Sequence, residues 1–253
     1  MTSDPSCPSL RILRAYRFVT LADPALWQVA IRDRAGTLGL KGTVLVAGEG
    51  INLALAGDAV DLETFVDWLR ADPLFADLQP HRDAVPALPF QRLKVRLKRE
   101  IIRMDRPLIR PAAGRAAALS PQTLARWLAA GHDDGGRPLA LLDTRNAFEV
   151  DAGRFEGAID WRLARFGDFP AAFAAHREEL AGKTVVSYCT GGIRCEKAAL
   201  LMREQGIAAW QLDGGIQGYF EAVGAAHFDG GCFVFDGRET VAPDRLPPAA
   251  TGA

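Results

Sequence analysis

Residues 183–194 read Lys-Thr-Val-Val-Ser-Tyr-Cys-Thr-Gly-Gly-Ile-Arg, and this stretch decides the fold of the second half of the chain. Its first six residues are rich in β-branched and apolar side chains, which predicts a buried strand that runs into Cys189. Two glycines follow in a short turn, and the pattern beyond them indicates a helix over residues 195–205. Ligands of parallel α/β sheets bind at the carboxyl ends of strands, so Cys189 lies where chemistry is expected.

The sequence around this stretch alternates between expected strands and helices. Ser120 and Pro121 are typical of a helix N-cap and a first helical turn. Such alternation predicts a mostly parallel α/β sheet, and we assign residues 119–241 to one α/β domain. Strands are expected over residues 139–143, 183–188 and 208–212, and helices over residues 121–128, 169–180 and 195–205.

The first part of the chain shows a different order of elements. Strands are expected over residues 11–20, 40–47, 51–56 and 93–97, and helices over residues 25–34 and from Asp58 or Asp61 to Leu69. This βαββαβ order predicts a ferredoxin-like domain over residues 10–103. Residues 104–118 are rich in Pro, Arg, Gly and Ala and are interpreted as a linker, and residues 242–253 as a disordered tail.

Composition limits the classes of function. The chain has 253 residues, a net charge of −1 and 49% hydrophobic residues, which fits a globular protein of two domains. No apolar stretch reaches the roughly 20 residues that span a bilayer, and the N-terminus lacks a secretory pattern, so we expect a cytoplasmic protein without membrane contact. The four cysteines are too few for a disulfide scaffold, and no metal-ligand spacing occurs, so no metal is expected.

The turn after Cys189 is suited to an anion. Successive backbone N–H groups converge in such a turn, and the start of the next helix adds a favourable field, so both lower the pKa of a thiol. Gly191 and Gly192 permit the backbone angles, while Arg194 is expected as a cation that faces the mouth of a pocket and binds an anionic substrate. The alternative is a buried structural cysteine before an ordinary turn.

The length of the loop narrows the chemistry. Cysteine phosphatases place five residues between Cys and Arg to cradle a phosphate, whereas four residues, Thr190 to Ile193, separate Cys189 from Arg194. The tighter loop favours binding of a sulfur atom. Cys195 is interpreted either as a resolving thiol for Cys189 or as a small packing residue. Glu196 and Lys197 are interpreted as first-turn and surface residues of the following helix, and a catalytic role is the alternative.

Basic and apolar residues alternate along residues 92–98. Because side chains of a strand alternate between its faces, Arg92, Lys94, Arg96 and Lys98 are expected on one face. Such a row suits the phosphate backbone of a nucleic acid. Cations also shield an exposed sheet edge from unwanted pairing. The residues by themselves leave both interpretations open.

Several motifs resemble those of known proteins. Four motifs resemble, in their order along the chain, the signatures of a rhodanese domain. They are Leu-Leu-Asp-Thr-Arg at 141–145, Gly-Arg-Phe-Glu-Gly-Ala at 153–158, the Cys189 loop and Leu-Asp-Gly-Gly-Ile at 212–216. Longer runs within residues 42–52, 94–101, 189–197 and 231–238 resemble the rhodanese-domain tRNA uridine-34 hydroxylases. The resemblance extends over residues 12–241. Arg154 and Thr144 depart from the usual His and Val, outside the Cys189 loop.

The resemblance implies an oxidoreductase that hydroxylates the wobble uridine of tRNA to 5-hydroxyuridine with molecular oxygen as co-substrate and no other evident cofactor. It carries the catalytic role onto Cys189 only, and an anion-binding role onto Arg194. Thr190, Gly191, Gly192 and Ile193, which complete the loop, are predicted to bind substrate as well. It also favours tRNA as the partner of residues 92–98. The main alternative is a sulfurtransferase with a Cys189 persulfide. A non-enzymatic binding module would not need the intact cysteine loop.

Overall fold

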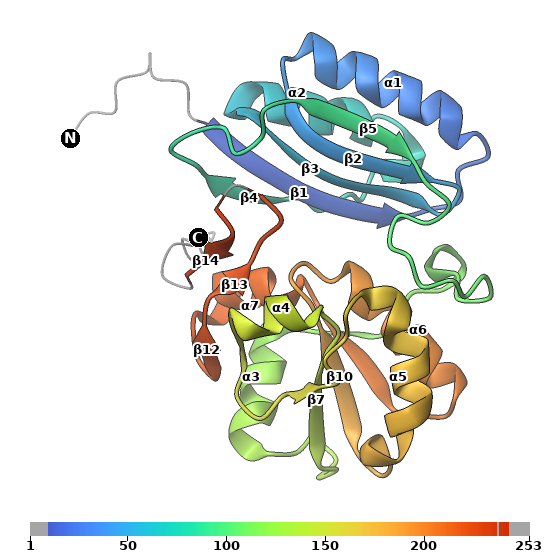
Figure 1. The fold of residues 1–253 in the computed structure, drawn as a ribbon, viewed down its shortest axis with the longest axis vertical. Coiled ribbons are helices and arrows are strands. Elements are labelled where there is room, and N and C mark those ends of the chain that lie inside the picture. Colours follow the sequence, from blue (N-terminus) through green and yellow to red (C-terminus); the bar gives the residue numbers. More distant parts are fainter. Residues whose placement is uncertain (1–9, 237, 243–253) are drawn as a thin grey trace. The chain divides into compact units, whose positions relative to one another are not determined.

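The structure is a computed structural model that describes residues 10–236 and 238–242 (Figure 1). The described chain divides into two compact units, the first ending at Ile101 and the second beginning at Ile102. The tail predicted over residues 242–253 lies outside the described residues, apart from Ala242. Within the described ranges, no helix combines the length and the apolar character that crossing a membrane requires.

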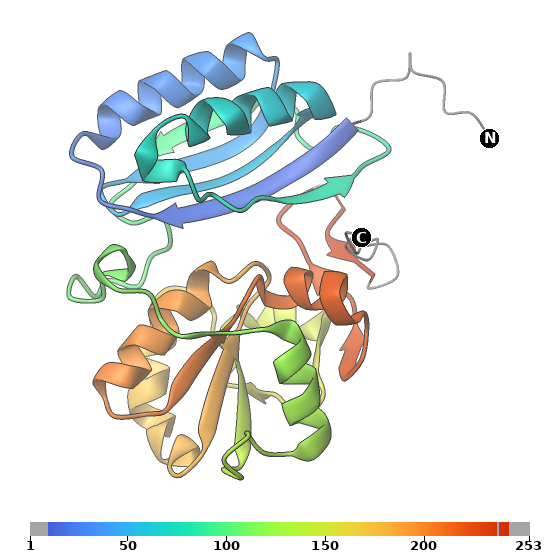
Figure 2. The same cartoon turned by 180° about the vertical axis from the view of Figure 1, so that it is seen from behind.

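The first unit is a sheet covered on one face by two helices (Figure 2). Asp23 and Asp58 cap the helices by accepting hydrogen bonds from the amides of Leu26 and Val60. The apolar core lies between the helices and the sheet. The strands are β1 (Leu10–Phe18), β2 (Lys41–Ala47), β3 (Gly50–Asp58), β4 (His81–Ala84) and β5 (Leu93–Leu97), in the order β4-β1-β3-β2-β5, and the helices are α1 (Pro24–Thr37) and α2 (Ala59–Arg70).

The expected ferredoxin-like fold is confirmed, but its last strand was assigned wrongly. The βαββαβ order is completed by β4, which pairs antiparallel with β1, and not by residues 93–97. Those residues form β5, an additional strand that pairs parallel with β2 at the opposite edge. Sequence reasoning missed β4 because His-Arg-Asp-Ala has no alternation of apolar residues, and its pairing partner lies far away in the sequence.

Helix α1 covers the free edge of β5 with polar side chains. The Gln28 amide and the Arg32 guanidinium both donate hydrogen bonds to the Val95 carbonyl oxygen, at 3.0 and 3.2 Å. Val95 and Leu93 pack into the core on the helix side of the sheet. Since side chains alternate along a strand, Lys94 and Arg96 lie on the face that carries no helix.

The second unit is built on a five-stranded parallel sheet, which confirms the expected α/β domain. Two apolar cores cover its two faces. Strand β7 has the predicted bounds. The strands are β6 (Ala118–Leu119), β7 (Leu139–Asp143), β9 (Ile159–Asp160), β10 (Thr184–Tyr188) and β11 (Ala209–Leu212), in the order β6-β11-β10-β7-β9.

Five helices and two small β ladders complete the described part of this unit. Neither α4 nor α7 was predicted, α6 begins two residues earlier than expected, and the helix expected over 169–180 continues as a 3-10 turn after His176. The helices are α3 (Pro121–Ala130), α4 (Ala147–Asp151), α5 (Phe169–His176), α6 (Ile193–Glu204) and α7 (Gly215–Val223). The ladders pair β8 (Gly153–Phe155) with β12 (Phe228–Gly230), and β13 (Cys232–Phe233) with β14 (Thr240–Val241).

Residues 102–118 pack onto the second unit. Met104, Ile109 and Ala116 are buried in the same apolar core as α5 and α6. Regular structure within this segment is limited to a short 3-10 turn, Pro111–Ala113, and to Ala118, the first residue of β6. The segment interpreted as a linker therefore contributes side chains to the core of the α/β unit.

Candidate active site

Cys189 lies at the centre of the parallel sheet, directly after β10, which pairs with β7 on one side and β11 on the other. Its side chain is 1% exposed. The Gly192 amide donates a hydrogen bond to the Cys189 Sγ atom at 3.2 Å, and the amides of Arg194 and Cys195 also point at this sulfur. Gly192 adopts a φ of 98°, a left-handed conformation that glycine tolerates best. The loop therefore surrounds the sulfur with N–H donors, as the sequence predicts.

The first turn of α7 holds the carbonyl groups of the loop. The amides of Ile216 and Gln217 donate to the carbonyl oxygens of Cys189 and Thr190 at 2.9 and 3.1 Å. Gly215 makes this approach possible, since a Cβ atom there would lie 2.4 Å from the Cys189 oxygen, and its φ is 61°. With these carbonyls bound to α7, the amides of the loop remain directed at the sulfur.

Cys189 and Cys195 share the site as a thiolate and a thiol. Burial would raise the pKa of Cys189, but the Cys195 thiol, the Arg194 charge and the amides of Arg194 and Cys195 outweigh it and lower that pKa. The pKa of Cys195 is raised well above its ordinary value, by burial and by the neighbouring Cys189 sulfur. At neutral pH the negative charge therefore resides on Cys189, and Cys195 keeps its proton.

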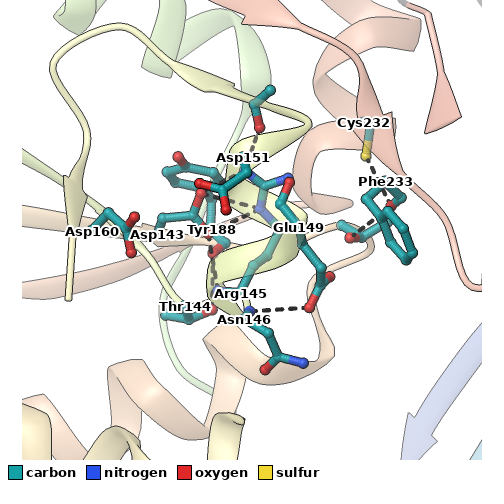
Figure 3. Close-up of polar contacts among 12 residues, drawn as sticks. Asp143, Thr144, Arg145, Asn146, Glu149, Asp151, Asp160, Tyr188, Cys232 and Phe233 are labelled. Atoms are coloured by element: carbon teal, nitrogen blue, oxygen red, sulfur yellow. Dashed lines mark hydrogen bonds and ion pairs between the residues drawn. The ribbon is translucent and has the colours of Figure 1, made fainter. Parts of the chain in front are cut away.

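Arg194 has a buried partner that the sequence did not reveal. Its guanidinium is buried and forms two hydrogen bonds with the Glu149 carboxylate, at 2.6 and 2.7 Å. Burial opposes the charge of Arg194, but the hydrogen bonds and charge of Glu149 raise the pKa of this group. Glu149 also accepts a hydrogen bond from the Asn146 amide at the start of α4 (Figure 3). Arg194 thus holds its charge beside Cys189, while its contact with substrate stays a prediction.

A second buried ion pair supports α4. Arg145 is fully buried, contacts both oxygens of Asp143, and donates to the carbonyl oxygens of Glu149 and Gly153 at 3.1 and 2.7 Å. Figure 3 shows its side chain against Asp143 and the Tyr188 ring, whose centroid lies 5.6 Å from the guanidinium carbon. Arg145 thereby ties the end of β7 to the helix that presents Glu149.

Glu196 and Lys197 are buried and not on the helix surface, so that expectation was wrong. The Arg115 guanidinium donates to both Glu196 oxygens, at 3.0 and 3.3 Å. The Lys197 ammonium donates to the Ile102 carbonyl oxygen at 2.9 Å. Both charged residues therefore bind residues 102–118 to the helix that follows the cysteine loop.

The remaining predicted substrate-binding residues form the same loop. Thr190 is 8% exposed, and its hydroxyl donates to the Phe233 carbonyl oxygen at 3.4 Å. Gly191 and Ile193 are partly exposed, whereas Gly192 is buried. Their contact with substrate remains a prediction. Sequence reasoning missed Glu149 and Gly215. The spacing of Asn146 and Glu149 is that of a capping box and was a usable signal for Glu149.

The predicted RNA-binding residues all belong to the first unit. Lys94 and Arg96 lie on β5, and Arg92 and Lys98 lie immediately outside it. Lys94 is partly exposed and the other three are exposed. The two residues on the strand share the helix-free face of the sheet, and their role in RNA binding remains a prediction. Across the described ranges, 10–236 and 238–242, no group of three His, Cys, Asp or Glu side chains is placed to hold a metal ion.

Comparison with known proteins assigns both halves of the chain. Residues 10–101 match the UPF0176 acylphosphatase-like domain family, and residues 120–222 match the rhodanese-like domain family. A tRNA uridine(34) hydroxylase of Variovorax paradoxus is 59% identical over 239 residues, covering 94% of this chain and 91% of the relative. The tRNA uridine(34) hydroxylase of Bordetella petrii is 57% identical, with 96% and 97% covered.

The chain belongs to the tRNA uridine(34) hydroxylase family. A more distant member, from Burkholderia pseudomallei, is 53% identical over 242 residues and 81% of its length is covered. Membership in the tRNA uridine(34) hydroxylase family confirms the resemblance drawn from the motifs. It also favours an oxidoreductase over the sulfurtransferase that the cysteine loop alone left open.

Proposed function

We propose that this protein hydroxylates the wobble uridine of tRNA at C5 in an oxygen-dependent reaction, with Cys189 as the reactive group. The observation that carries the proposal is a buried cysteine whose pKa is lowered by loop amides and by Arg194, in a chain of this family. A thiolate is the nucleophilic form of cysteine. A tRNA substrate implies that the protein works in the cytoplasm.

A thiolate suits this reaction because C6 of uracil is conjugated to the C4 carbonyl and accepts nucleophiles. Addition of the Cys189 sulfur at C6 turns C5 into an enolate carbon, which is able to react with oxygen. The wobble base lies in the single-stranded anticodon loop, so the enzyme need not break a base pair to reach it. Amides of Gly192, Arg194 and Cys195 stabilise the thiolate before the attack.

Arg92, Lys94, Arg96 and Lys98 are the proposed contacts to the tRNA backbone. Support comes from Lys94 and Arg96, which lie on the sheet face of the first unit that carries no helix. Cations on such a face bind phosphates without reading sequence, which suits a domain that holds the tRNA while the second unit performs the chemistry.

The test is nucleoside mass spectrometry of tRNA from cells with and without the gene. We expect 5-hydroxyuridine to fall on deletion, to return with the wild-type gene and to stay absent with a Cys189→Ser gene. Two results together would instead establish a sulfurtransferase. The 5-hydroxyuridine content of tRNA would be unaffected by deletion of the gene, and the purified protein would transfer sulfur from thiosulfate to cyanide. If the cells also make 5-hydroxyuridine by a second pathway, the same test is made in vitro with the purified protein and a tRNA transcript.

A further inference from the structure

We propose that Cys189 and Cys195 together supply the two electrons that the hydroxylation consumes, and that they leave each turnover as a disulfide. The inference rests on the proposed function and identifies the electron donor of that reaction. Insertion of one oxygen atom of O2 into a C–H bond leaves the other atom to become water, which requires two electrons and two protons. Two thiols that close to a disulfide release two electrons.

The geometry places the second thiol against the first. Cys195 lies in the first turn of α6, six residues after Cys189, and both side chains are buried. The backbone amide and the thiol of Cys195 both face the Cys189 sulfur, and both lower the pKa of Cys189. The Thr144 hydroxyl, which donates to the Tyr188 carbonyl oxygen at 2.9 Å, lies 4.0 Å from the Cys195 sulfur. Cys195 is therefore held beside the reacting sulfur.

The two sulfurs differ in protonation state, and this gives them different roles in the reaction. Cys189 carries the charge and is the stronger nucleophile toward C6 of uracil, while Cys195 holds its proton. While Cys189 is bound to C6, Cys195 remains a free thiol next to the C5 position where oxygen has reacted. A neighbouring thiol of this kind is suited to reduce a hydroperoxide, which is the first step of the cysteine oxidation series.

The Cys189 thiolate forms a bond to C6, and C5 then bonds to O2 and takes up a proton to give a hydroperoxide. The Cys195 sulfur attacks the outer oxygen, the O–O bond breaks, and the thiol proton passes to the oxygen left on C5. Loss of the C5 proton and of the C6–sulfur bond releases 5-hydroxyuridine. Cys189 then displaces hydroxide from the Cys195 sulfenic acid, and the hydroxide becomes water. The sum is uridine, O2 and two thiols giving 5-hydroxyuridine, a disulfide and water.

The proposal requires a thiol reductant, such as a small thiol or a dithiol protein, to reopen the disulfide before the next turnover. This requirement gives a direct test with the full-length wild-type enzyme. The enzyme is reduced, freed of small thiols without oxygen, and mixed with a tRNA transcript in oxygenated buffer. We expect product to stop at about one per chain, with a Cys189–Cys195 disulfide appearing in the digest, and to resume when dithiothreitol is added.

Variants separate the redox role from the effect of Cys195 on its neighbour. Cys195→Ser keeps a hydroxyl beside Cys189 but forms no disulfide, so we expect its single-turnover product without added thiol to be lost. Its Cys189 should still form a thiolate below the ordinary pKa. Cys232→Ser is the matched control, because Cys232 is also a buried cysteine of the second unit and has no role in the scheme. It should behave as wild type.

The outcomes are distinguishable. Product that accumulates past one per chain without a reductant, while both thiols remain open to alkylation, would overturn the proposal. So would a disulfide that forms equally fast without tRNA. Disulfide mapping in the wild-type chain decides the matter even when Cys195→Ser fails to fold. If no 5-hydroxyuridine appears even with excess thiol, the proposed function itself fails.

Discussion

The cations around Cys189 and the cations along β5 lie in opposite surroundings. The second unit buries Arg145, Arg194 and Lys197, each bound to a carboxylate or a backbone carbonyl. The first unit leaves most of the cations along β5 exposed. Buried charges are strongly coupled to the fold, whereas exposed ones contribute little to stability. We therefore expect changes around Cys189 to affect chemistry and folding together, and changes along β5 to affect binding alone.

The largest effect is expected for Cys189→Ser. Hydroxylation should fall to background, because a serine hydroxyl is not ionised near neutral pH and lacks the nucleophilicity of a thiolate. Affinity for tRNA should stay near that of wild type, since the change leaves the first unit intact. Turnover and tRNA binding are measured on the same preparation. Turnover close to wild type would remove Cys189 from the mechanism.

Gly215→Ala tests whether α7 positions the cysteine loop. The added Cβ would lie 2.4 Å from the Cys189 oxygen and 2.8 Å from the Gly192 nitrogen, so the loop must move. Displacement of a reacting group by 1 Å costs about 100-fold in rate, and we expect a loss of this order. Gly157→Ala is the control, because Gly157 has a similar φ of 68° and open space around it. Equal losses in the two variants would show that backbone strain alone is responsible.

Glu149→Ala should destabilise the second unit by about 3–5 kcal/mol, because it leaves the buried Arg194 charge without its partner. Removal of both the Glu149 and the Arg194 side chains should lower the free energy of unfolding by less than the sum of the two single removals. Asp134→Ala provides the contrast. Asp134 pairs with Arg126 where both side chains are exposed, so its loss should lower the free energy of unfolding far less than Glu149→Ala does. Urea denaturation gives the free energy of unfolding of the Glu149 variant, the Arg194 variant, the double variant and Asp134→Ala. Additive losses in the double variant would contradict the coupling of Glu149 and Arg194.

Charge reversal on β5 tests whether the exposed cations of the first unit affect tRNA binding. Lys94→Glu with Arg96→Glu should weaken tRNA binding and reduce its salt dependence, by roughly 0.7 to 0.9 in the log-log slope for each lost phosphate contact. The matched control reverses Arg137 and Lys183, which lie at the amino ends of β7 and β10, opposite to the Cys189 end. If both pairs change the affinity and the salt slope alike, β5 has no particular role.

The smallest effect is a shift in titration. The lowered pKa of Cys189 means that its thiolate persists as the pH falls below about 8.5, the ordinary pKa of a cysteine. The ultraviolet absorbance of thiolate, taken as the difference between wild type and Cys189→Ser, should therefore still be present at pH 7. Arg194→Met should move the midpoint upward, since it removes a cation next to the sulfur. An ordinary midpoint in wild type would mean that the loop amides do not face Cys189.

Local patterns in the sequence predicted the three central strands of the second unit, β7, β10 and β11, and the helices α3, α5 and α6. The apolar run before Cys189, its glycines and the alternation around it sufficed for the strand, the loop and the parallel sheet. The sequence did not reveal the partner of Arg194, because Glu149 lies 45 residues away and only folding brings the two together. Strand β4 was not predicted for the same reason, because it is a strand by virtue of its pairing with β1 and not of its composition. The Leu-Asp-Gly-Gly-Ile motif likewise did not reveal that Gly215, the first residue of α7, allows that helix to approach the cysteine loop.

The packing of residues 102–118 has a consequence for how the catalytic half can be separated from the rest. The rhodanese-like match begins at residue 120, which suggests a natural place to cut. A chain that started there would lose Met104 and Ile109 from the core, and it would leave Glu196 and Lys197 buried without Arg115 and the Ile102 carbonyl. We therefore expect that a fragment or a domain swap that separates the second unit has to keep the residues from Ile102 onward.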